Sequence, residues 1–190
     1  MPVTINGDGS ISGLSVGGLG SGVVNTATLA DGAATDVKQG AGSVVQIQNV
    51  TISGDNVRTT TTTGSWLDNY STTKQYQRID FTPKFSNSKL LLLASGGLRY
   101  NADTQGNAGY AQVRIIDATN SNTQVAYTKY GMYAYTGGYI RSSGHWTCMS
   151  YINASSTNMR RYNCQYYFDG AQTYYYGTEG DSITVMEIRQ

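Results

Sequence analysis

Tyrosine has the most uneven distribution of any residue type that could do chemistry in this sequence. Of the 16 tyrosines, many fall between Tyr127 and Tyr139 or in the run Tyr174–Tyr176. A tyrosine ring supplies a large contact area at low entropic cost, and its hydroxyl adds a hydrogen bond. Such rings, flanked by short polar side chains, bind sugars. The same rings also suit a subunit interface, where aromatic residues are enriched.

The first cluster supplies the candidate contacts for a glycan. They are Tyr130, Tyr133, Tyr135, Tyr139, Lys129 and Arg141. Glycines among them predict a loop that bends and exposes the rings. Lys129 and Arg141 flank the segment and could pair with an acidic sugar, because no carboxylate lies between them to repel it. If the rings pack between subunits instead, the binding site lies elsewhere.

Residues that usually carry catalysis are scarce. The chain has one His and only two Glu. A Ser-His-Asp triad would need His145, which stands beside Trp146, and the chain has no nucleophile-elbow motif. Glu179 and Asp181 could form the carboxylate pair of a glycosidase, but an acidic turn before the last strand accounts for both. The sequence therefore predicts a protein without a catalytic site.

The motifs indicate no metal, cofactor or nucleic acid. The glycine-rich stretch 17–22 lacks the lysine of a phosphate-binding loop. Asp117, Asn120 and Asn122 suit a hairpin turn and do not have the spacing of a calcium loop. Two Cys and one His are too few ligands for zinc. With 13 Lys and Arg against 12 Asp and Glu, the net charge of +1 gives no electrostatic footprint for nucleic acid.

The sequence also lacks the signs of membrane insertion or export. It has no run of about 18 apolar residues, so we expect no membrane span. Residues 1–8 have neither a basic segment nor an apolar core, so we expect no secretory signal there.

The elements that must position these side chains follow a long glycine-rich segment. Every aromatic residue comes after position 65, and residues 1–42 hold only scattered apolar side chains. Burying one such side chain gains roughly 1.5–3 kcal/mol, whereas ordering one backbone residue costs roughly 1–2 kcal/mol. This arm is therefore either disordered or ordered by a partner, and its spaced apolar residues favour the partner. Within it we expect two short strands in 5–16 and helical turns near 26–32 and 35–39.

From residue 43 the apolar pattern has the period of two that is typical of strands. Strands are expected at 44–52, 74–81, 89–95, 110–116, 123–128, 145–153, 158–168 and 181–189, with an exposed edge or loop at 59–63. The run Leu90–Leu93 is apolar on both faces, which predicts a central strand buried between layers. Residues 43–190 are thus predicted to form an all-β domain, an antiparallel β-sandwich of jelly-roll type.

The two cysteines, Cys148 and Cys164, are expected to face each other across a hairpin of 145–153 and 158–168. That register places both on a core face, with Trp146 opposite Tyr166. As buried free thiols they would act as small hydrophobic groups. A cross-strand disulfide is the alternative if their Cβ atoms come to about 4 Å. The expected lack of a signal peptide favours the thiols.

Three stretches of the sequence carry a family resemblance. They are the opening 3–19, the segment 26–46, and the body motifs at 81–83, 88–92 and 183–188. Together they resemble small tail-fibre and other virion structural proteins of tailed phages, especially phages that infect marine bacteria. The resemblance implies homotrimers built into the virion, with a distal β-domain that can meet the host surface. It carries over no functional residues.

We therefore expect a non-enzymatic phage virion protein, made in the host cytoplasm, without cofactors. It would be a homotrimeric tail fibre or tail-tip protein that docks to other virion proteins through residues 1–42. Its β-domain would contact a host-surface polysaccharide, and Val44, Ile47 and Val50 would lie near the subunit contact. The alternatives are a capsid decoration or head-fibre protein, a carbohydrate-binding lectin-like module, and a small glycan-cleaving enzyme.

Overall fold

The chain divides into two units, Met1–Gln39 and Gly40–Gln190, and each is described by itself. The computed structural model describes residues 4–5, 7, 11–12, 40–52, 58–60, 64–69, 76–102, 108–133, 140–169, 173–176 and 180–190. In the first unit, β1 (Thr4–Ile5) pairs antiparallel with β2 (Ile11–Ser12), which are two short strands in the region where the sequence predicts them. The expected helical turns at 26–32 and 35–39 lie outside the described residues.

In the second unit the described residues form antiparallel strands and no helix. The strands are β3 (Val44–Thr51), β4 (Arg58–Thr60), β5 (Trp66–Asp68), β6 (Arg78–Phe81), β7 (Lys89–Ala102), β8 (Ala108–Asp117), β9 (Thr123–Tyr133), β10 (Ile140–Asn153), β11 (Arg160–Asp169), β12 (Thr173–Tyr176) and β13 (Ser182–Ile188). Each expected strand has a counterpart, although β7, β9 and β10 are longer than the sequence indicates and β6 is shorter than the expected 74–81. The short strands β5 and β12 were not expected.

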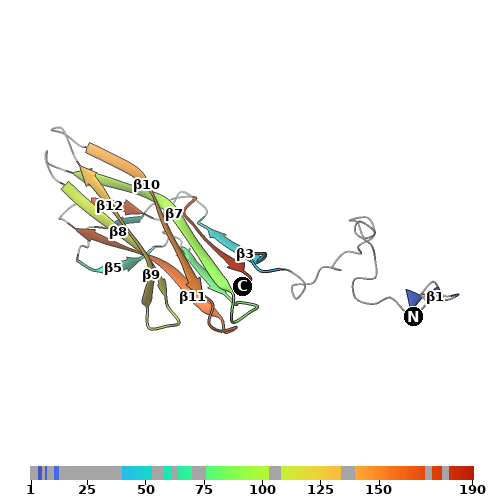
Figure 1. Cartoon of the computed structure of the whole chain (residues 1–190). Helices are drawn as coiled ribbons and strands as arrows, with labels where there is room; N and C mark the ends of the chain where they lie inside the picture. Colours follow the sequence, from blue (N-terminus) through green and yellow to red (C-terminus); the bar gives the residue numbers. More distant parts are fainter. Residues whose placement is uncertain are drawn as a thin grey trace. The chain divides into compact units, whose positions relative to one another are not determined.

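Eight of these strands form the two sheets of a jelly roll (Figure 1). One sheet has the order β3–β13–β7–β10, and the other has the order β6–β11–β8–β9. The first of the eight pairs with the last, the second with the seventh, the third with the sixth, and the fourth with the fifth. Nested pairs of this kind arise when one long hairpin rolls into two sheets. The predicted fold class is therefore confirmed.

The three remaining strands extend the sheets. β5 pairs with β11 next to β6 in the second sheet. In the first sheet, β13 lies along β7 from Lys89 to Ser95, and β12 lies along it from Arg99 to Asn101. β4 then pairs with β12. Residues 96–98 of β7 consequently lie at a gap between the ends of β13 and β12.

The core fills the space between the two sheets, because inward and outward residues alternate along each strand. Its fully buried members include Leu90, Leu92, Val113, Ile115, Tyr162, Cys164, Tyr166, Phe168, Ile183 and Val185. The Trp146 ring meets Tyr166 edge-on, with 5.6 Å between centroids, and Tyr166 stacks on Phe168 at 5.7 Å. The expectation that both faces of 90–93 are buried is wrong: Leu91 and Leu93 are half-buried on the outer face of the sheet.

The expected hairpin of 145–153 and 158–168 is also wrong. β10 pairs with β7 along its whole length, from Ile140 opposite Ala102 to Asn153 opposite Lys89. β11 pairs with β8 in the facing sheet. The alternation of apolar residues identifies which face of each strand is buried, but it does not identify the strand's partner. The inward residues of β10 and β11 therefore reach the core from opposite sheets.

A buried carboxylate organises the loop that leads into β7. Glu187 of β13 is fully buried and accepts hydrogen bonds from the backbone N–H groups of Lys84 and Phe85, at 2.9 Å each. It also accepts from Ser88 Oγ at 2.7 Å and Gln46 Nε2 at 2.6 Å. Burial raises the pKa of Glu187, but these hydrogen bonds outweigh burial and hold the pKa below its ordinary value.

Candidate functional site

The outer face of the second sheet is polar and aromatic, and we call it the polar face. Its outward side chains in β5, β6, β11, β8 and β9 include Trp66, Asp68, Arg78, Asp80, Tyr110, Gln112, Arg114, Tyr127, Lys129, Arg161, Asn163, Gln165, Tyr167 and Asp169. Tyr110 and Tyr127 are the most exposed rings, at 42% and 47%. A sheet face of this composition offers flat rings together with hydrogen-bonding groups to a ligand.

Cations lie over rings at two places on the polar face. The Arg114 guanidinium carbon is 4.0 Å from the centroid of the Trp66 ring, and Lys129 Nζ is 4.2 Å from the centroid of Tyr110. Trp66 also packs at a tilt against Tyr167, its neighbour across the β5–β11 pair, with 5.5 Å between centroids. These contacts hold both the rings and the charges in fixed positions.

Hydrogen bonds connect the polar side chains between the rings. Arg114 donates to Gln165 Oε1 from Nε at 2.9 Å and from Nη2 at 2.7 Å. Gln165 Nε2 donates to Asp68 Oδ1 at 2.8 Å. The Tyr127 hydroxyl donates to Gln112 Oε1 at 3.1 Å. The polar face is therefore an ordered array of side chains.

The structure separates the predicted glycan contacts. Lys129 lies on the polar face, but Tyr130 points inward and packs against the core. Tyr133 lies in β9 and Arg141 in β10, so the segment up to residue 133 is a strand where a loop was expected. The side chains of Tyr133 and Arg141, and the whole of Tyr135 and Tyr139, lie outside the described residues.

The sequence analysis missed Tyr110, Arg114 and Tyr127 as members of this surface. Strand alternation carries the signal: Tyr127 and Lys129 are two residues apart and share a face, whereas Tyr130 falls on the other face. Gly131 led to the prediction of a loop, so the strand alternation was not followed beyond residue 128.

The outer face of the first sheet, which we call the apolar face, has the opposite character. One row across four strands reads Ile47, Met186, Leu91 and Tyr151, and the next reads Asn49, Thr184, Leu93 and Met149. Ile47, Tyr151 and Met149 are 58%, 54% and 66% exposed. In the rows where all four strands pair, from Lys89 to Ser95 of β7, Lys89 is the outward residue that carries a charge.

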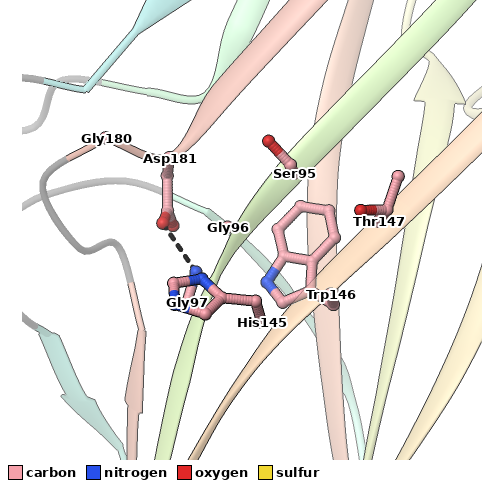
Figure 2. A pocket seen from close by; sticks show the side chains of 8 residues that line it. All are labelled: Ser95, Gly96, Gly97, His145, Trp146, Thr147, Gly180 and Asp181. Atoms are coloured by element: carbon pink, nitrogen blue, oxygen red, sulfur yellow. Dashed lines mark hydrogen bonds between the residues drawn. The ribbon is translucent and has the colours of Figure 1, made fainter.

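A pocket of about 220 Å³ opens at the gap beside β7 (Figure 2). Its lining residues are Ser95, Gly96, Gly97, His145, Trp146, Thr147, Gly180 and Asp181. The buried Asp181 carboxylate accepts the Gly97 N–H at 2.9 Å, and it also accepts from Asn69 Nδ2 at 3.1 Å. The side chain of Asp181 thus provides the acceptor that a neighbouring strand would provide at this point of the ladder.

The pocket brings together Ser95, His145 and Asp181, the residue types of a catalytic triad. Ser95 Oγ lies 3.3 Å from Ser182 Oγ, across the β7–β13 pair. Asp181 is engaged with the backbone of Gly97 as described above. These hydrogen bonds tie the hydroxyl and the carboxylate to the sheet, which is a structural role. Glu179, the other carboxylate of the expected acidic turn, lies outside the described residues.

Both cysteines are free and buried. Burial raises the pKa of the Cys148 thiol to about 11 and outweighs a hydrogen bond with the Ile115 backbone, which lowers it. Burial, and then the proximity of Cys148, raises the pKa of Cys164 well above its ordinary value. At neutral pH both groups are protonated thiols, which are poor nucleophiles and poor metal ligands.

Within the described ranges, no group of three His, Cys, Asp or Glu side chains is placed to hold a metal ion. Asp117 accepts from Thr119 N at 3.1 Å and so closes the turn after β8, as its sequence context predicts. In the same described part of the chain, no helix is long and apolar enough to cross a membrane.

No protein-family model matches the chain, and no curated protein matches it. Solved structures with a similar arrangement include infectious bursal disease virus, Gt strain, at 11% identity and a TM-score of 0.38, over 78% of this chain and 38% of that one. They also include the VP2 subviral particle of that virus, at 14% identity and a TM-score of 0.30, over 76% and 32%. This chain spans less than two fifths of the length of either.

Proposed function

We propose that this protein is a non-enzymatic virion structural protein of a tailed phage, a homotrimeric tail fibre or tail-tip protein. It docks to the particle through residues 1–42 and presents the β-domain to the host surface. One observation carries the proposal: the jelly roll has one outer face that is mostly uncharged in the described rows where β3, β13, β7 and β10 pair, and another that is polar and aromatic. Jelly rolls build viral coats and lectins, where such faces assemble and bind.

The apolar face is the proposed contact between copies. Charged residues are depleted and Met and Tyr are enriched at interface cores, as on this face. Gly42 N donates to Arg189 O at 2.8 Å, so the start of the domain lies beside the residue that follows β13. β3, which comes next, is the edge strand of the apolar face. Val44 and Ile47 are exposed there, whereas Val50 packs against the core and is left out of the contact.

The polar face is the proposed contact with the host surface. Its rings, amides and cations are the groups that recognise polysaccharides, and three copies would add avidity to weak individual contacts. The same face favours a second candidate function, a lectin-like module that works outside a particle. A capsid decoration or head-fibre protein would have the same two faces and a different position in the virion.

The location of the chain tests the proposal directly. Peptide mass spectrometry of purified phage particles should find the chain, and gold-labelled antibodies against residues 40–190 should mark the tail in electron micrographs. Gold on the head would favour the capsid decoration or head-fibre alternative. A chain that never co-purifies with particles would overturn the virion assignment and favour the lectin-like module.

A further inference from the structure

We infer that the outward side of the β8–β9 hairpin binds an acidic polysaccharide, one rich in carboxylates. The inference rests on the proposed host contact and assigns it to residues other than the predicted tyrosine loop. The binding surface consists of Tyr110, Gln112, Arg114, Tyr127 and Lys129, and we call it the β8–β9 platform.

The strand register makes the platform flat and continuous. Gln112 lies opposite Lys129, and Arg114 lies opposite Tyr127, so the four side chains form two adjacent cross-strand pairs. Tyr110 lies opposite Gly131, and its ring lies close to this glycine on the neighbouring strand. A Cβ built at Gly131 would be 3.5 Å from Tyr110 Cε1. Two exposed rings therefore flank a row of polar groups, in the arrangement that a chain of sugar rings can follow.

The charge of the platform selects an acidic ligand. Its five side chains include two cations, Arg114 and Lys129, and the nearest carboxylates stand on the neighbouring strands. Asp169 of β11 lies opposite Tyr110, and the charge of Asp68 of β5 acts on Arg114, so Lys129 is the cation for which the described residues show no such neighbour. Elsewhere on the polar face, the Arg161 cation is neutralised by Asp80, with two contacts at 2.7 and 2.8 Å. Among the described residues, neither Lys129 nor Arg114 forms such an ion pair; each lies over a ring instead. A cation held on a ring keeps its charge for a carboxylate of a ligand.

The platform is also ordered before any ligand arrives. Arg114 is fixed by Gln165 and by the Trp66 ring, and the Tyr127 hydroxyl is fixed by Gln112. Side chains that are already in place lose little entropy on binding. A nucleic acid would need a wider basic surface than two cations in a chain of net charge +1, so the polysaccharide is the better match.

Affinity electrophoresis of the full chain tests the inference. Native gels containing the polyuronates alginate or pectate should retard the protein, and gels containing neutral dextran should not. Raising the salt concentration should reduce the retardation, because the contact is ionic and exposed. Lys129→Gln should weaken binding by about tenfold, the usual effect of losing one charged hydrogen bond. Tyr127→Ser should weaken it as well.

Lys89→Gln is the matched control. Lys89 also lies over a tyrosine ring, with 5.7 Å between Nζ and the centroid of Tyr151, but it stands on the apolar face. This variant should bind polyuronates as the parent chain does. Equal retardation by dextran, no retardation by either polyuronate, unchanged affinity in Lys129→Gln, or tighter binding to single-stranded DNA would each overturn the inference. Particle labelling does not depend on glycan binding, so a chain that is found on the tail but fails here loses this inference alone.

Discussion

At the scale of single residues, two glycines on neighbouring strands show how little space the core leaves. A Cβ built at Gly96 would lie 2.7 Å from Asp181 Cγ and 2.7 Å from Trp146 Cζ2. A Cβ at Gly144 would overlap the Tyr130 hydroxyl. Both positions therefore need glycine because a side chain passes over the backbone there.

Gly96→Ala should lower the free energy of unfolding by roughly 1–3 kcal/mol, the usual cost of overpacking. Both neighbours are held in place, Asp181 by Gly97 and Trp146 by the ring of Tyr166, so neither moves away cheaply. Urea unfolding followed by tryptophan fluorescence measures the effect. Gly131→Ala is the control, because its new Cβ would make an ordinary contact with Tyr110. Equal stability of the two variants would contradict the steric explanation.

The buried carboxylate of Glu187 predicts a dependence of stability on pH. Its pKa in the folded state lies below the ordinary value of 4.5. The stabilisation from its hydrogen bonds is therefore complete above about pH 4.5 and is lost as the pH falls through the folded-state pKa. Glu187→Gln should cost about 1.5–3 kcal/mol at neutral pH and flatten the acid limb of the stability curve.

Urea midpoints of the parent chain and Glu187→Gln, measured from neutral to acidic pH, check this prediction. Asp80→Asn is a useful comparison, because the Arg161 hydrogen bond also lowers the pKa of Asp80 but both groups are largely exposed. Its effect should be smaller, as for other surface ion pairs. Parallel curves for Glu187→Gln and the parent chain would show that Glu187 is not responsible.

At the scale of elements, the sequence predicted which face of a strand is buried better than it predicted which strand lies beside it. The sequence placed Cys148 and Cys164 on a core face, and the structure confirms that both are buried. It could not show that β10 pairs with β7, because a strand's partner depends on residues far away in the chain. The candidate site was predicted only in part for the same reason. Lys129 was identified from its neighbours in the sequence. The contact between Trp66 and Arg114 could not be, because these residues come together only when β5 and β8 both pair with β11.

The two faces of β7 predict different costs for the same substitution. Leu92 is fully buried between the sheets, so Leu92→Ala should cost roughly 2–5 kcal/mol. Leu91 lies half-buried on the apolar face, and Leu91→Ala should cost less than half as much in the isolated domain. Chemical denaturation of the two variants gives the ratio directly. An equal decrease in the free energy of unfolding for both variants would show that Leu91 is packed as tightly as Leu92.

At the scale of the whole molecule, the apolar face predicts the assembly state. Ile47→Lys would put a charge on the proposed contact and should convert trimers to monomers in native mass spectrometry. Tyr127→Lys, at a residue of similar exposure on the polar face, should leave the trimer intact. Circular dichroism should report the same strand content in both variants. A trimer that survives Ile47→Lys would move the subunit contact to another surface.

The place of β13 in the first sheet has a consequence for biosynthesis. β13 lies between β3 and β7. During synthesis β3, the first strand of the jelly roll, therefore has no pairing partner until residues 182–188 have left the ribosome. Long-range pairing of this kind folds slowly. A copy whose translation stops before β13 would keep a gap in the middle of a sheet and leave inward residues such as Leu90 and Leu92 partly uncovered. We therefore expect a copy without β13 to be unable to complete the first sheet of the jelly roll.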